Sequence, residues 1–280
     1  MAARRSEDFA GFVCFHVFGW LALTVLGIFA IEVAKNASGD IFDFDSGNDQ
    51  AVRAEDRTPF SGGKRVLLDG FLTRGQTIGI AVMSYLVGIL AGLSIVIWRE
   101  PSVLWWGILG TGMAFFYHAP PFKLSYRGLG ELAVAISYGP LICAGTYLVQ
   151  RGAISMEVIV ISILLGLLIG SFLLINEFPD YHADLSADKN TLVVRLGRRN
   201  ASRLFAGLVA SAFVILFALP FLKFPFTIWL GFAAAPLAYS ATRLLLQNPE
   251  TTSRIIPAQG NTLFAFVLFA FGSGIGLALG

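Results

Sequence analysis

Charged residues are scarce in this sequence: only 14% of its 280 residues are Asp, Glu, Lys or Arg, whereas soluble proteins contain about a quarter. This scarcity excludes an ordinary soluble domain. The hydrophobic fraction of 56% and the mean hydropathy of +0.72 indicate a membrane protein instead. The net charge of +2 is too small to favour nucleic acid as a partner.

Cysteine is also nearly absent. Cys14 and Cys143 both lie inside apolar runs, where we expect small buried side chains and neither a disulfide nor a metal site. The N-terminal segment lacks the pattern of a signal peptide with a cleavage site, so we expect none to be removed.

Apolar runs long enough to cross a bilayer fill most of the chain. Only helices and closed barrels satisfy the backbone in lipid, so runs of this length indicate helices. We therefore expect an all-α integral membrane bundle of about eight helices, forming one domain over residues 1–280. The expected spans are residues 9–35, 76–98, 103–119, 130–149, 157–176, 203–222, 226–245 and 261–279.

Basic residues are distributed unevenly between the two ends of these helices. Fifteen of the twenty Lys and Arg residues fall in four loops and their flanks, near 36–75, 120–129, 177–202 and 246–260. The positive-inside rule therefore places these loops in the cytoplasm, and we expect the inner cell membrane as the location. Arg4 and Arg5 fall on the opposite side, which an additional preceding helix would explain.

Two acidic clusters each follow an apolar run. In the first, Asn36 precedes Asp40 and Asp43, which are three residues apart and can share a helix face. In the second, Asn176 precedes Asp180 and Asp184, which are four apart and also share a face. Carboxylates this close repel each other unless a cation lies between them.

Carboxylate oxygens without cysteine or paired histidine ligands suit Mg²⁺, which completes its shell with water and phosphate oxygens. Basic residues follow each cluster: Arg53 and Arg57 the first, Lys189 and Arg195 the second. Acids, metal and bases together form a diphosphate clamp. We expect the two clusters to face each other, with helices 9–35 and 157–176 as near neighbours. The alternative for either cluster is a solvated charged loop.

Further polar residues border the apolar spans. Tyr117 and Lys123 flank a Pro-Pro pair and can reach a phosphate, although an aromatic belt with positive-inside lysines explains the same residue types. His118 and His182 are candidate bases, or simply hydrated side chains. Glu32 lies within the last turns of a span, where an acid is a functional candidate unless its side chain reaches the interface.

A diphosphate clamp at the mouth of an apolar bundle suits a substrate that is half diphosphate and half hydrocarbon. A polyprenyl diphosphate would leave its head with the metal and its tail between the helices, in contact with the lipid bilayer. Metal neutralises the leaving diphosphate, and aromatic faces stabilise the allylic cation that remains. The 25 phenylalanines of the chain offer many such faces.

The segments Asn36–Asp43 and Asn176–Asp184, with Lys189-Asn-Thr-Leu-Val-Val-Arg195-Leu-Gly after the second, resemble the UbiA superfamily of intramembrane prenyltransferases. The run Tyr126–Glu131, and Tyr138-Gly-Pro after it, are similar to 1,4-dihydroxy-2-naphthoate polyprenyltransferases of menaquinone synthesis. The resemblance runs from about residue 30 to residue 200, and more weakly to the end of the chain.

The resemblance implies roles for individual residues. Asp40, Asp43, Asp180 and Asp184 would bind Mg²⁺ and diphosphate, and Tyr117 would lie near the reacting carbon. The phosphate and substrate contacts that it implies come from Asn36, Arg53, Arg57, Lys123, Asn176, Lys189 and Arg195.

The chain departs from the family pattern in two places. The family commonly has Asn directly before the first Asp of its first motif, where this chain has Gly39, which leaves open whether Asp45 or Asp49 completes the motif. The family usually has nine helices, whereas eight are expected here. The first helix of the family is the one that has no counterpart among these eight.

These features predict a Mg²⁺-dependent prenyltransferase that alkylates an aromatic acceptor, with dihydroxynaphthoate favoured. Other acceptors (hydroxybenzoate, homogentisate, a glycerol phosphate or a porphyrin) remain alternatives. A phosphatidyltransferase would carry a tight Asp-Gly…Ala-Arg…Gly…Asp-x3-Asp run, which this sequence lacks. A membrane transporter is the alternative from a different class, and it predicts acids near the middle of the membrane.

Overall fold

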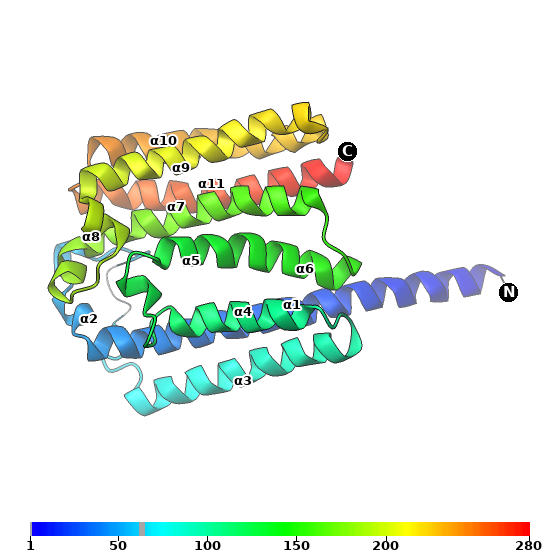
Figure 1. The fold of residues 1–280 in the computed structure, drawn as a ribbon, viewed down its shortest axis with the longest axis horizontal. Helices are drawn as coiled ribbons and strands as arrows, with labels where there is room; N and C mark the ends of the chain where they lie inside the picture. Colours follow the sequence, from blue (N-terminus) through cyan, green and yellow to red (C-terminus); the bar gives the residue numbers. More distant parts are fainter. Residues whose placement is uncertain (1, 62–64) are drawn as a thin grey trace.

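Long helices run back and forth between the two ends of the molecule (Figure 1). The structure is a computed structural model that describes the backbone of residues 2–61 and 65–280, and side chains from residue 17 onward outside that gap. The side chains of Arg4, Arg5 and Cys14 therefore lie outside the described residues. The helical elements are α1 (Ala2–Asp45), α2 (Asn48–Ala51), η1 (Ala54–Asp56), α3 (Arg74–Trp98), α4 (Val103–Phe116), η2 (Leu124–Tyr126), α5 (Gly130–Ile136), η3 (Ser137–Leu141), α6 (Ile142–Arg151), α7 (Met156–Ser186), α8 (Leu192–Leu196), α9 (Arg198–Ala218), η4 (Leu219–Leu222), η5 (Phe226–Ala234), α10 (Ala235–Gln247) and α11 (Thr252–Leu279).

The expected all-α membrane bundle is confirmed. Within the described part of the chain, six helical segments are long and apolar enough to cross a membrane. They are Val17–Asp45, Arg74–Trp98, Gly130–Arg151, Met156–Ser186, Arg198–Leu222 and Thr252–Leu279. The remaining two expected spans correspond to the shorter α4 and to η5 joined with α10.

The core lies around α7, which packs against α5, α9 and α11. Phe178 of α7, Phe205 of α9 and Phe269 of α11 are completely buried there. The outer faces carry exposed large apolar side chains such as Leu90 and Ile97 of α3, as expected where lipid takes the place of water.

Two of the expected spans are not regular α-helices. The segment 226–245 begins as the 3₁₀ segment η5 and becomes α-helical only from Ala235, where Pro236 occupies the first turn. The segment 130–149 contains a π-turn at Ser137–Leu141 around Pro140. Proline lacks an N–H and its ring collides with the carbonyl one turn earlier, so a widened turn accommodates it.

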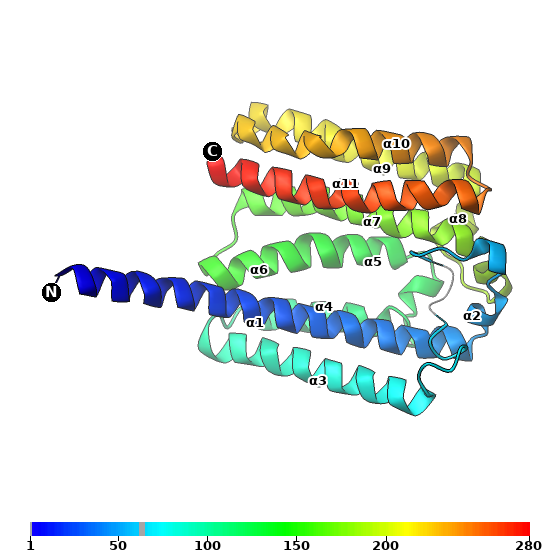
Figure 2. The same cartoon turned by 180° about the vertical axis from the view of Figure 1, so that it is seen from behind.

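The described parts of the four loops rich in Lys and Arg gather at one end of the bundle, around α2 and α8 (Figures 1 and 2). Helix α1 continues through the first acidic cluster and ends only near Gly47, which has the left-handed φ of 80° that glycine adopts readily. Helix α7 likewise continues through the second cluster to Ser186. Both clusters therefore lie on helix ends, and helix geometry fixes the faces that their acids share.

Candidate active site

Both acidic clusters line a single cavity of about 670 Å³ at the polar end of the bundle. Eight of the residues that the sequence assigned to the site line it: Asn36, Asp40, Asp43, Tyr117, Asn176, Asp180, Asp184 and Lys189. The two clusters face each other within metal-bridging reach, as expected, because Asp43 Oδ2 and Asp184 Oδ1 each lie within 3.7 Å of Lys189 Nζ. Among the described residues, direct packing of helices 9–35 and 157–176 on each other is not observed. Helix α1 packs chiefly on α3, and α7 on α9, α11 and α5; the α5–α6 segment lies between α1 and α7 (Figures 1 and 2).

On the α1 side, hydrogen bonds hold the side chain of Asp43. The hydroxyl of Tyr126 donates to Asp43 Oδ1 at 2.7 Å, and the Tyr126 hydroxyl also lies 2.9 Å from Ser46 Oγ. Tyr126 belongs to the short 3₁₀ segment η2 in the loop after α4. A distant loop thus orients this carboxylate toward the cavity.

On the α7 side, the acids are more deeply buried. The Asp184 residue is only 1% exposed, and its Oδ1 accepts a hydrogen bond of 2.9 Å from Nδ2 of Asn48 in α2. Oδ1 of Asp180 is buried without a hydrogen-bond partner. A carboxylate oxygen without a partner is costly in a dry site, so Asp180 has the bonding capacity that a cation or a ligand donor would use.

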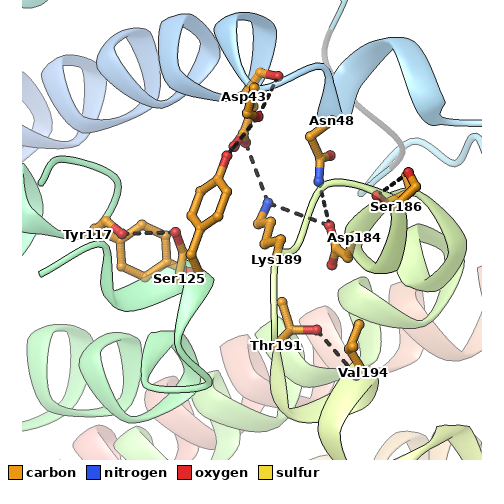
Figure 3. Close-up of polar contacts among 12 residues, drawn as sticks. Asp43, Asn48, Tyr117, Ser125, Asp184, Ser186, Lys189, Thr191 and Val194 are labelled. Atoms are coloured by element: carbon orange, nitrogen blue, oxygen red, sulfur yellow. Dashed lines mark hydrogen bonds and ion pairs between the residues drawn. The ribbon is translucent and has the colours of Figure 1, made fainter.

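Lys189 connects the two clusters across the cavity (Figure 3). Its Nζ lies 3.5 Å from Asp43 Oδ2 and 3.7 Å from Asp184 Oδ1, and its side chain is 15% exposed. Burial alone would lower the pKa of Lys189, but the carboxylates of Asp43 and Asp184 outweigh it and raise that pKa well above its usual value. The ammonium group therefore stays charged and partly balances the acids around it.

The structure distinguishes the two candidates for the last acid of the first cluster. Asp49 is 8% exposed and lines the cavity. Burial, and then the nearby Asp43 and Asp40 carboxylates, raise the pKa of Asp49 to about 6. Asp45 is exposed and pairs with Arg74 at 2.8 Å. Asp49, not Asp45, is therefore the acid that faces the cavity.

The cavity provides oxygen ligands of the kind that a hard cation prefers. In the described part of the chain, no three His, Cys, Asp or Glu side chains lie close enough together to hold a metal ion by themselves. Magnesium usually takes only one or two carboxylates and fills the rest of its shell with water and phosphate. The two pairs of carboxylates, including the unpartnered Asp180 oxygen, fit that mode of binding.

Four predicted phosphate ligands do not line the cavity. Arg53, Arg57 and Arg195 are exposed, and Arg195 Nε donates to the backbone oxygen of Asn190 at 3.0 Å. Lys123 is partly buried, with its Nζ 5.4 Å from the centre of the Tyr126 ring. Because these four side chains do not line the cavity, their phosphate contacts stay predictions.

Several cavity residues escaped the sequence reasoning. Glu177 is 8% exposed, has an unpartnered Oε2 and lines the cavity beside Asn176. Asn48, Lys35 and Tyr138 line it as well. The sequence offered two signals. Glu177 lies between Asn176 and Asp180, and Lys35 lies within an apolar span. The sequence marked Tyr138 only as part of the Tyr138-Gly-Pro resemblance, without a role.

The structure explains why glycine occupies the position before Asp40. A Cβ built on Gly39 would lie 2.5 Å from Cε1 of His118, and His118 is itself buried. An asparagine side chain at this position would have no room. The imidazole thus occupies the space that the common family residue would need.

We therefore predict that Gly39→Asn destabilises the protein by about 1–3 kcal/mol, the usual cost of overpacking. The measurement is thermal unfolding of the purified protein in detergent. His118→Ala in the same chain creates room and should recover most of the loss. A double variant no more stable than Gly39→Asn would show that the His118 ring is not the obstacle.

A second, smaller cavity of about 190 Å³ adjoins the first. It lies among α1, α3, α4 and the α5–α6 segment, with glycines and aliphatic side chains such as Gly27, Ile28 and Gly92 in its walls. Lys35, Tyr117 and Tyr138 line both cavities. The polar site therefore borders apolar space inside the bundle, with these three residues and Val134 at the boundary.

Comparison with known proteins finds a matching family and similar sequences. Residues 10–268 match the model of the UbiA prenyltransferase family. The 1,4-dihydroxy-2-naphthoate octaprenyltransferase of Mycobacterium tuberculosis is 30% identical, over 93% of this chain and 86% of its own length. The 2-carboxy-1,4-naphthoquinone phytyltransferase of Synechocystis is 32% identical, over 91% and 79%. The Bacillus subtilis 1,4-dihydroxy-2-naphthoate octaprenyltransferase is 27% identical, over 85% and 76%.

Proposed function

The chain belongs to the UbiA prenyltransferase family, and from this premise we propose that it transfers a polyprenyl chain to 1,4-dihydroxy-2-naphthoate in menaquinone biosynthesis, using Mg²⁺. The family and its relatives indicate a membrane-embedded enzyme that transfers a prenyl group from a prenyl diphosphate to an aromatic substrate. Enzymes of this family are generally metal-dependent. The ion, the acceptor and the role of each residue are the proposal.

The observation that carries the proposal is that the two acidic clusters and Lys189 share one cavity. Asp40 and Asp43 from α1 and Asp180 and Asp184 from α7 would hold Mg²⁺. When bound, this ion supplies positive charge that stabilises the departing diphosphate. A solvated acidic surface would not explain why Asp184 is buried and held by Asn48.

The protein's own groups bind and orient the donor substrate. Lys189 would move from its carboxylate partners to a phosphate oxygen, because a doubly charged ion compensates Asp43 and Asp184 in its place. Tyr126 and Asn48 keep those two carboxylates oriented. The prenyl chain would enter the apolar cavity past Tyr117, so that the reacting carbon lies near its ring, which can stabilise a developing allylic cation.

The relatives and the chemistry support this acceptor. Two of the similar proteins are named for dihydroxynaphthoate and a third for a carboxylated naphthoquinone. An electron-rich dihydroxynaphthoate ring would attack the first carbon of the prenyl chain as the bond to diphosphate breaks. Loss of the ring carboxylate would then give a demethylmenaquinol.

Incubation of the purified protein with a polyprenyl diphosphate, Mg²⁺ and a panel of acceptors tests this proposal. Mass spectrometry should detect prenylated dihydroxynaphthoate and little product from hydroxybenzoate, homogentisate, a glycerol phosphate or a porphyrin. No product should form when a chelator removes the metal. Restored Mg²⁺ should restore product. Preferential prenylation of another acceptor would overturn the acceptor assignment, whereas product formed in excess chelator would overturn the metal requirement.

The proposed orientation places the cavity on the cytoplasmic side of the inner membrane. In a chain without its native cysteines, Gln50→Cys and Ser186→Cys at the polar end, both exposed, should resist a membrane-impermeant thiol reagent in intact cells. Ser102→Cys, exposed at the opposite end between α3 and α4, should react. Both groups should react after the cells are opened. Labelling of residue 50 or 186 in intact cells would contradict the orientation.

A further inference from the structure

An ion pair within the first membrane span forms a closed hydrogen-bond network with a tyrosine. Oε1 of Glu32 accepts from Lys35 Nζ at 2.8 Å and from Asn36 Nδ2 at 2.9 Å. The hydroxyl of Tyr138 donates to the other Glu32 oxygen and accepts from Lys35 Nζ at 3.2 Å. The network therefore joins one turn of α1 to the π-turn η3.

The network lies where the two cavities meet. Glu32, Lys35 and Tyr138 line the apolar cavity, and Lys35 and Tyr138 also line the polar one. A substrate with its diphosphate among the aspartates and its chain in the apolar cavity must place its reacting carbon at this junction. The aromatic acceptor must therefore approach these side chains.

The backbone around Tyr138 positions this side chain at the junction of the two cavities. The π-turn at Ser137–Leu141 contains Pro140, and π-turns occur frequently at functional sites. Gly139 packs so closely on α7 that a Cβ there would lie 2.4 Å from the Ser162 carbonyl oxygen. Close packing on one side of the turn holds the neighbouring Tyr138 against Glu32 on the other.

The network has bonding capacity left for a ligand. The Tyr138 oxygen donates one hydrogen bond and accepts one, so that a further lone pair can accept a proton donor. The Glu32 side chain is 34% exposed, within a cavity whose other lining is mostly apolar. A charged pair inside a membrane span is costly to keep, and such pairs mark functional sites. Packing alone would be served by apolar residues.

We propose that Glu32 and Tyr138 form the proton-accepting site for a ring hydroxyl of the acceptor, an inference that rests on the proposed prenyl transfer. The acceptor hydroxyl donates to the Tyr138 oxygen. As the ring attacks, its hydroxyl proton passes to Tyr138 while the Tyr138 proton passes to Glu32. Tyr138 touches the acceptor and is the catalytic residue; Glu32 acts through it, and Lys35 positions both.

The step balances without another reactant. The ring carbon beside the hydroxyl forms a bond with the first prenyl carbon, and the electron pair of the broken C–O bond leaves with diphosphate. The hydroxyl becomes a carbonyl as its proton leaves for Tyr138. When the attacked carbon bears a carboxylate, CO₂ departs, the bonding pair stays on the ring, and the carbonyl oxygen takes the proton back. No net proton is released.

The test combines Glu32→Gln with an acceptor that lacks the proton. Rates are measured for wild type and variant with 1,4-dihydroxy-2-naphthoate and with its 1-O-methyl ether. With the free hydroxyl, kcat of the variant should fall about 10²-fold, at the lower end of the usual range for proton transfer. With the methyl ether, wild type and variant should be equally slow. The KM for the prenyl diphosphate should change little.

Control variants separate this role from a structural one. Tyr138→Phe should show the same pattern as Glu32→Gln, because either change interrupts the relay. Glu157→Gln, at the start of α7 at the opposite end of the bundle, should leave both acceptors unaffected. If Glu32→Gln slows both acceptors by the same factor, its role is structural and the inference is overturned. A wild-type protein that prenylates no acceptor would instead overturn the proposed function, and this inference with it.

Discussion

Asp180→Asn is expected to lower kcat about 10³-fold while the protein remains folded. The substitution keeps the size of the side chain and removes its charge. Removing a single group that stabilises developing charge in a transition state typically lowers kcat about 10²–10³-fold. Losing a metal ligand adds to this loss, because removing even an indirect contact to a ligand lowers metal affinity or activity about 10–100-fold. The loss should fall mainly on kcat, because charge on the diphosphate grows toward the transition state.

Steady-state kinetics at several Mg²⁺ concentrations measures this effect, and raised Mg²⁺ should recover part of the loss. Asp45→Asn is the matched control, because Asp45 lies on α1 but is exposed and pairs with Arg74 outside the cavity. It should turn over like the wild type. Normal turnover of Asp180→Asn at low Mg²⁺ would remove the second cluster from the active site.

Lys189→Met is expected to destabilise the protein by about 3–5 kcal/mol in the absence of metal, the usual effect of removing one partner of a buried ion pair. Asp43 and Asp184 would then face each other without the ammonium group that lies within 3.7 Å of both. A divalent cation replaces part of the missing charge. Added Mg²⁺ should therefore raise the melting temperature of the variant more than that of the wild type.

Thermal unfolding in detergent, with chelator and with Mg²⁺, provides the measurement. Lys189→Arg keeps the charge and should retain most of the stability. Because Arg and Lys differ in geometry, its ability to hold a phosphate is measured separately, by the KM for the prenyl diphosphate. Equal melting temperatures for wild type and Lys189→Met in chelator would mean that Lys189 does not compensate the acids.

Local patterns were sufficient for the fold class and for most of the acids that line the cavity. Apolar runs that exceed the thickness of a bilayer allow only a few structures, so the helical bundle followed from chain length and hydropathy. Asp180 and Asp184 share a face of α7 because helix geometry requires it at a spacing of four. The same holds for Asp40 and Asp43 on α1, once the helix continues through them.

The cross-chain contacts followed from packing, which no local pattern records. From the sequence, either Asp45 or Asp49 could complete the first motif. The turn at Gly47 between them places Asp45 in solvent and Asp49 in the cavity. Arg53, Arg57 and Arg195 follow the acids in sequence as Lys189 does, yet they face solvent because their backbone segments leave the cavity.

The junction of the two cavities depended most on tertiary structure. Glu32 and Tyr138 are 106 residues apart, and the π-turn around Pro140 and the close approach of Gly139 to α7 decide that they meet. The sequence thus determined which groups the chain carries and on which helix ends they lie, because hydrophobic length and helical spacing are local properties. Which of those groups share a cavity was decided by helix packing, because such contacts join residues far apart in the chain.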